Sequence, residues 1–148
     1  MGLKGLLMTI LWVVTGASHL MRETLDAVSK IQAEYEVAFS KSGEFVARYL
    51  KVYEEITENS QQKYVESEVG PNPMLITALS GYSHILASPC TANTIAKVNA
   101  GIADSLASNI IAQGLKKRLE VILIPTDSEA EVKTQWKGET VTVYPRRR

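Results

Sequence analysis

Cysteine is nearly absent from the sequence, because its 148 residues contain only one, Cys90. A single thiol excludes a disulfide within the chain and excludes a zinc or iron–sulfur site built from several cysteines. Low cysteine usage is typical of proteins in a reducing compartment, so we expect a cytoplasmic location. Cys90 precedes an expected helix, whose N-terminus would lower the pKa of the thiol, whereas a small, buried and inert cysteine is the commoner case.

The sequence also lacks an excess of either charge and a long apolar run. Sixteen Lys and Arg residues balance sixteen Asp and Glu residues, so nothing predicts a nucleic-acid partner. The apolar run within Met1–Val14 is too short to span a bilayer, and we interpret it as a core strand rather than as a signal peptide. We therefore expect neither nucleic acid nor a membrane among the partners.

Familiar cofactor and catalytic motifs are missing as well. The segment Thr15-Gly16-Ala17-Ser18 lacks the second and third glycines of the dinucleotide-binding fingerprint, and the chain contains no P-loop. Neither a Ser-His-Asp spacing nor a cluster of metal ligands stands out, so we expect no metal site.

What is present is an alternation of apolar strands with amphipathic helices. The expected strands are Leu6–Val14, Glu36–Ser40, Lys63–Val69, His84–Ala87 and Glu120–Pro125. The expected helices are Leu20–Tyr35, Glu44–Ile56, a short Met74–Leu79, and a segment from Thr91 that is interrupted near Gly101. This order predicts a three-layer α/β/α fold of the Rossmann or flavodoxin type with a mostly parallel sheet. We expect one domain over residues 1–148, in which 128–148 forms a C-terminal arm or a short last strand, Glu139–Tyr144.

Small polar residues follow three of these strands, in the segments Thr15–Ser18, Ser40–Ser42 and Ser88–Thr94. Because the carboxyl ends of parallel strands share one edge of a sheet, we expect the three segments to lie close together. Hydroxyl groups and the N–H groups of helix starts are donors that suit a phosphate. The alternative is that these residues are ordinary caps and turns, with Ser18 as the N-cap of the first helix. Three converging segments favour a mononucleotide site.

Three further side chains leave alternatives open. Asn93 either offers its amide to a ligand or caps the helix. His19, just after the first strand, is a candidate general acid or base, and equally an exposed residue at a helix start. His84 lies at the opposite end of its strand from the expected site, so we assign it a structural role.

The segment Ser88–Asn109, SPCTANTIAKVNAGIADSLASN, resembles the signature of the homo-oligomeric flavin-containing cysteine decarboxylase-like flavoproteins. That family includes phosphopantothenoylcysteine decarboxylases, flavin prenyltransferases, and archaeal and bacterial electron-transfer flavoproteins such as the acceptor-linked dihydromethanopterin reductases. The stretches VVTGASHLMRET and VAFSKSGEFV are similar to the last group. The resemblance covers most of residues 9–127.

This resemblance implies FMN as the cofactor and a homo-oligomer as the assembly, a trimer that is often built into a dodecamer. It implies that the flavin is held by residues of the three polar segments: Thr15, Gly16, Ala17, Ser18, Ser40, Ser88, Thr91, Ala92, Asn93 and Thr94. Ser88 and Thr91–Thr94 match the block that holds the phosphate and the isoalloxazine ring.

Key residues of the more specialised relatives are missing. The catalytic His and the Met-Asn-x-x-Met pattern of the decarboxylases are not visible, and Pro125-Thr126-Asp127 stands where the prenyltransferases carry an Arg-Glu pair. The resemblance therefore implies an FMN-dependent oxidoreductase or electron carrier, with dihydromethanopterin as the small-molecule substrate and a ferredoxin-type protein as the donor. A flavin prenyltransferase or decarboxylase-like enzyme and a non-catalytic flavin-binding subunit remain the alternatives.

Overall fold

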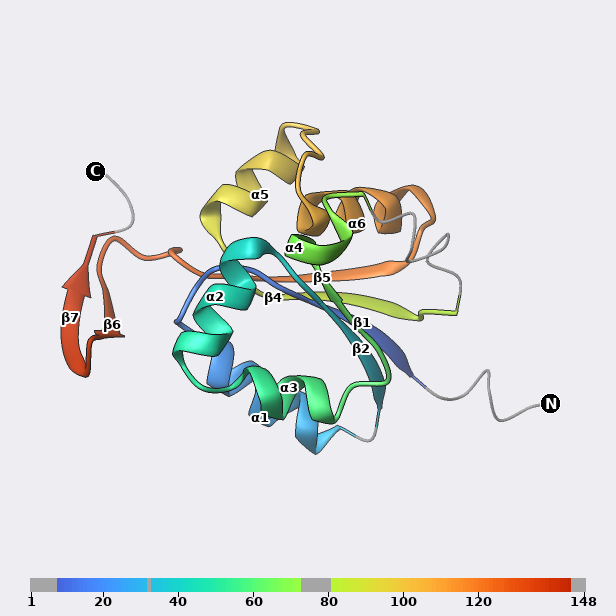
Figure 1. The fold of residues 1–148 in the computed structure, drawn as a ribbon. Coiled ribbons are helices and arrows are strands. Elements are labelled where there is room, and N and C mark those ends of the chain that lie inside the picture. The colour runs from blue at the N-terminus through green and yellow to red at the C-terminus, as the bar shows by residue number, and fades with distance from the viewer. Residues whose placement is uncertain (1–7, 32, 73–80, 145–148) are drawn as a thin grey trace.

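The computed structural model describes residues 8–31, 33–72 and 81–144. Its main sheet has five strands, which are β1 (Thr9–Val14), β2 (Glu34–Phe39), β3 (Lys63–Val65), β4 (His84–Cys90) and β5 (Glu120–Pro125). They lie in the order β3-β2-β1-β4-β5, and every neighbouring pair is parallel (Figure 1). The sheet is thus parallel throughout, because each connection carries the chain back across a face of the sheet.

Helices cover both faces of the sheet (Figure 1). One face carries α1 (Met21–Lys30), α2 (Lys41–Tyr49) and α3 (Tyr53–Glu58). The other carries α4 (Glu66–Val69), α5 (Ala92–Asn99) and α6 (Leu106–Lys116). Side chains of β1 alternate between the two cores: Trp12 packs on the side of α1, whereas Leu11 and Val13 pack on the side of α6. The predicted three-layer α/β/α fold is confirmed.

A separate antiparallel hairpin, β6 (Val132–Trp136) and β7 (Glu139–Val143), stands at the side of the sheet (Figure 1). The expected last strand is one half of this hairpin. The hairpin contacts the main body through β6, where the hydroxyl groups of Thr134 and Ser18 share a hydrogen bond of 2.7 Å. The Trp136 ring also stacks on Tyr49, with 5.9 Å between the ring centroids.

Several expected boundaries are wrong, each for a local reason. Ser18 is not the N-cap of α1, because the helix begins only after Leu20, which adopts a left-handed backbone with φ 68°. That helix ends at Lys30, and Tyr35 belongs to β2. The second helix begins at Lys41 rather than at the expected Glu44, because Ser40 caps it.

Other differences concern the ends of longer elements. The expected helix Glu44–Ile56 is two helices, because Lys51 takes a left-handed φ of 58° between them. The strand expected at His84–Ala87 continues to Cys90. The break near Gly101 is confirmed, because α5 and α6 are separate helices there. The expected helix Met74–Leu79 and the start of the first strand lie outside the described residues.

The fifth strand is apolar in sequence, yet in the single chain it is only partly buried. Ile122 and Ile124 are 40% and 38% exposed, because β5 forms one edge of the sheet.

Within the described ranges, no helix is long and apolar enough to cross a membrane.

Candidate functional site

The site is built where the parallel strands β1 and β4 lie side by side. From β1 the order of strands runs outward to β2 and β3 on one side and to β4 and β5 on the other. Parallel α/β sheets bind ligands at the carboxyl ends of such strands. Thr15 fixes this junction, because its buried hydroxyl donates to the Pro89 carbonyl oxygen at 2.6 Å and accepts the Thr91 N–H at 3.0 Å. The start of α5 is thereby held against the end of β1.

A cavity of about 340 Å³ opens at this edge. Its lining contains six of the predicted cofactor-binding residues: Thr15, Gly16, Ser40, Thr91, Asn93 and Thr94. The other lining residues are Lys41, Ser42, Glu66, Lys97 and Ser105. The three polar segments that follow β1, β2 and β4 therefore contribute to one cavity, as the parallel topology predicts.

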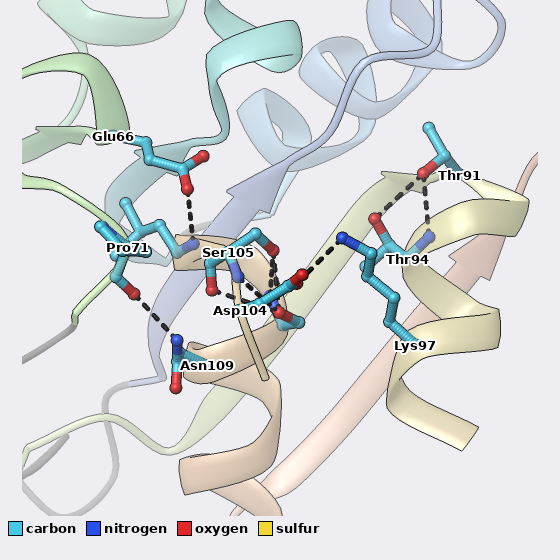
Figure 2. A network of polar contacts seen from close by, with 10 residues as sticks. Glu66, Pro71, Thr91, Thr94, Lys97, Asp104, Ser105 and Asn109 are labelled. Carbon is cyan, nitrogen blue, oxygen red and sulfur yellow. Dashed lines mark hydrogen bonds and ion pairs between the residues drawn. The ribbon is translucent and has the colours of Figure 1, made fainter. Parts of the chain in front are cut away.

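Two helices begin at the cavity, and their first N–H groups are its main donors. The Ser40 hydroxyl caps α2 by accepting the Gly43 N–H at 2.9 Å. Thr91 caps α5 by accepting the Thr94 N–H at 3.2 Å (Figure 2). In the described part of the chain, the N–H groups of Ser42, Ala92 and Asn93 have no hydrogen-bond partner. Two helix N-termini with free N–H groups have the donors and the dipole orientation that suit an anion.

Asn93 does not cap α5, since Thr91 does so. Its side chain is exposed and lines the cavity, which leaves the amide available to a ligand. Gly16 also lines the cavity and lies against the start of α2. A Cβ atom at position 16 would come within 2.4 Å of the Ser42 Cβ, so only glycine allows the loop after β1 to approach α2 this closely.

Glu66 is a buried acidic residue of the cavity lining, and no motif in the sequence pointed to it. One carboxylate oxygen accepts the N–H of Lys41 at 3.1 Å, and the other accepts the N–H of Leu106 at 3.0 Å. Figure 2 shows the second of these contacts, at the start of α6. Glu66 therefore joins the first residues of α2 and α6 at the cavity.

Lys97 is the second residue that sequence reasoning missed. It lies on α5 three positions after Thr94, and this spacing places both side chains on one face of the helix. Its ammonium group lies 2.9 Å from the Asp104 carboxylate (Figure 2). This hydrogen bond is the largest reason why the pKa of Asp104 lies below its ordinary value.

Four predicted cofactor-binding residues lie outside the cavity lining: Ala17, Ser18, Ser88 and Ala92. Ser88 is buried, and its hydroxyl shares a hydrogen bond of 2.6 Å with that of Thr24 on α1. His19 is exposed and lines two other cavities, of about 360 and 340 Å³, beside the hairpin and away from this one. Cys90 is fully buried, and its burial raises the pKa of the thiol to about 11. These properties fit a small, buried and inert cysteine rather than a reactive thiol.

Comparison with proteins of known sequence relates the chain to flavoproteins. It is 34% identical over 142 residues to a dihydromethanopterin reductase (acceptor) of Methanocaldococcus jannaschii. The alignment covers 88% of this chain and 58% of that protein, so the chain spans little more than half of the relative's length.

Solved structures share the fold. Burkholderia xenovorans DmrB in complex with FMN, described as a cubic protein cage for redox transfer, matches with a TM-score of 0.79 and 25% identity, covering 94% of this chain and 77% of that chain. A dodecameric FMN-dependent Ubix-like decarboxylase from Escherichia coli O157:H7 matches with a TM-score of 0.61 and 19% identity, covering 83% of this chain and 69% of that one. The sequence model of the Flavoprotein family matches residues 6–140, and the chain therefore belongs to that family.

Proposed function

We propose that this chain binds FMN in the cavity between β1 and β4 and acts as a flavin-dependent oxidoreductase. The observation that carries the proposal is the convergence of two helix N-termini and several hydroxyl groups on one cavity. Each helix start contributes roughly half a positive charge, and together they suit the dianionic phosphate of a mononucleotide.

The residues of the cavity fit this cofactor. The N–H groups of Ser42 and Asn93 would hold the phosphate, with the hydroxyls of Ser40 and Thr94 beside them. FMN supplies the redox chemistry when it is bound, and the protein determines its position and potential through hydrogen bonds and helix dipoles. The family membership of the chain and the FMN complex of DmrB support this assignment.

Within this proposal, the substrate is dihydromethanopterin and the electron donor is a ferredoxin-type protein in the cytoplasm. Two electrons and two protons would pass from reduced flavin to the pterin, giving tetrahydromethanopterin and oxidised flavin. Support comes from the Methanocaldococcus jannaschii relative, which is a dihydromethanopterin reductase, and from DmrB, which is described as working in redox transfer.

We also propose that the chain forms a homo-oligomer, a trimer or a dodecamer. The cubic cage of DmrB and the dodecamer of the Escherichia coli protein support this. The exposed isoleucines Ile122 and Ile124 on the edge strand β5 are apolar surface that a second copy would cover. Light scattering of the purified protein would give the number of chains, and a monomer at all concentrations would contradict an oligomer.

The proposal is tested by loading the protein with FMN, reducing it without oxygen and adding dihydromethanopterin. We expect the oxidised flavin absorption band to return as tetrahydromethanopterin forms. A protein that does not bind added FMN would contradict the assignment of FMN as the cofactor. A flavin that stays reduced with the pterin but is prenylated by dimethylallyl phosphate would instead identify a prenyltransferase.

A variant pair locates the cofactor. Asn93→Ala removes an amide that lines the cavity, and we expect it to lower FMN affinity. Asn99→Ala is the matched control, because Asn99 is an exposed residue at the other end of the same helix. Equal FMN affinity in the two variants would contradict the role of Asn93.

A further inference from the structure

The cavity is lined by two basic residues, Lys41 and Lys97. The ammonium group of Lys97 is held in place by a neighbouring carboxylate. Lys41 is exposed, and no ion pair involves it in the described part of the chain. The Lys97 ammonium is held 2.9 Å from Asp104, a residue of the loop before α6 (Figure 2). Only 29% of the Lys97 side chain is exposed, whereas Asp104 is 59% exposed.

The carboxylate of Glu66, the acidic residue of the cavity, is held by partners other than this ammonium. Both carboxylate oxygens of Glu66 accept backbone N–H groups, from Lys41 and from Leu106. An ammonium group has three donors, and Asp104 accepts one of them. Two donors of Lys97 therefore remain for a ligand in the cavity.

We propose that Lys97 is the cationic ligand of a phosphate monoester bound at the starts of α2 and α5, and that Asp104 is the positioning residue for its ammonium. This inference rests on the proposed FMN function and names the group that recognises the phosphate. Lys97 follows Thr94 by one helical turn, so it extends the row of donors at the start of α5 across the cavity. A hydrogen bond between an ammonium and a phosphate oxygen is of the strong, charge-assisted kind.

Asp104 lowers the loss of conformational freedom that Lys97 undergoes when it binds such a ligand. A free lysine side chain must give up much of its conformational freedom when it binds, and this loss weakens the interaction. The hydrogen bond to Asp104 restricts the side chain in advance. Because the Asp104 carboxylate is exposed to solvent, the pair adds little to folding stability, and its main effect is to hold the ammonium in place.

The test compares the dissociation constants of FMN and riboflavin, which share the ring system and differ in the phosphate. The variants are Lys97→Met, Lys97→Arg and Asp104→Asn, with Lys116→Met at the exposed end of α6 as the control. We expect Lys97→Met to weaken FMN binding roughly 10- to 100-fold, the range for one hydrogen bond to a charged group, and to leave riboflavin binding unchanged.

The remaining variants separate positioning from folding. We expect Lys97→Arg to recover most of the FMN affinity and Asp104→Asn to lower it several-fold without affecting riboflavin. Lys116→Met should match the parent protein. Thermal unfolding of each apoprotein checks that it is folded, and Lys97→Gln replaces the Met variant if that one is not.

Two kinds of failure are distinguishable. If the parent protein binds neither flavin, the proposed function fails and this inference fails with it. If the parent binds FMN, an equal FMN affinity in Lys97→Met, or an equal loss of both flavins, overturns the role of Lys97 alone. An unchanged ratio of FMN to riboflavin affinity in Asp104→Asn overturns the positioning role.

Discussion

The Thr15 hydroxyl accepts a hydrogen bond from the backbone N–H of Thr91, with 3.0 Å between oxygen and nitrogen. The same hydroxyl donates to the carbonyl oxygen of Pro89 at 2.6 Å. These two contacts join the end of β1 to the residue that caps α5, across 76 positions of the sequence. The position of the α5 N-terminus at the cavity therefore depends on one buried hydroxyl group.

Replacing Thr15 with Val keeps the shape of the side chain but removes this hydroxyl. We expect the free energy of unfolding in urea to fall by about 1–3 kcal/mol, since a partly buried N–H group loses its partner. FMN affinity should fall as well, because the start of α5 is less firmly held. Thr15→Ser retains the hydroxyl and should lie close to the parent protein. Equal stability of the Val and Ser variants would contradict this role.

Glu66→Gln tests the link between α2 and α6. The amide retains one acceptor oxygen, so one of the N–H groups of Lys41 and Leu106 loses its partner. We expect a loss of about 1–3 kcal/mol in the free energy of unfolding. Glu68→Gln is the control on the same short helix, because Glu68 is exposed. If both variants unfold at the same urea concentration, Glu66 does not hold the two helix starts together.

The fold could be predicted from the sequence because two of its strands contain uninterrupted apolar runs. Residues 10–14 and 121–124 are such runs, and a parallel sheet then brings the segments that follow β1, β2 and β4 to one edge. The break between α5 and α6 was also predictable, because Gly101 takes a left-handed φ of 73°. These features depend on local pattern and topology alone.

The details of the site could not be predicted in the same way. Ser88 and Thr91 are both small hydroxyl residues after an apolar run, yet Ser88 is buried against Thr24 and only Thr91 lines the cavity. The direction of each side chain depends on where β4 ends, and that strand is longer than its apolar run. Glu66 was missed because its partners, two backbone N–H groups, lie 25 and 40 positions away in the sequence.

Gly43 and Gly114 provide a matched test of packing in two helices. A Cβ atom at position 43 would lie 2.1 Å from the Val14 carbonyl oxygen, which belongs to the backbone of β1 and cannot move freely. We expect Gly43→Ala to lower the free energy of unfolding by about 1–3 kcal/mol, despite the better helix propensity of alanine.

At position 114 the nearest atom is the Cδ1 methyl of Ile85, the far end of a flexible side chain. Gly114→Ala should therefore cost less, because the methyl group can rotate and alanine favours the helix. Urea unfolding of both variants measures the difference. A larger loss at position 114 than at position 43 would contradict the close contact between α2 and β1.

Cys90 predicts a specific dependence of stability on pH. Burial raises the pKa of its thiol to about 11 in the folded protein, above the ordinary value of 9.0 that applies when the chain is unfolded. The neutral thiol therefore favours the folded state fully below pH 9, and this contribution is lost as the pH rises towards 11. The free energy of unfolding of the parent protein should fall more steeply over this window than that of Cys90→Ala.

Tyr35, whose pKa is raised to about 12 by burial and by nearby Glu55, titrates in both proteins, so the difference between the two curves isolates the thiol. Iodoacetamide should also modify native Cys90 slowly at neutral pH and rapidly in urea. Fast modification of the native protein, together with identical pH curves, would show that the thiol is accessible.

The central claim is that the cavity between β1 and β4 binds FMN. The most direct measurement is to purify the protein without added cofactor, release its ligand by denaturation, and identify the ligand by mass. We predict FMN, at up to one molecule per chain. A preparation that contains no flavin and takes up none when FMN is added would contradict the account.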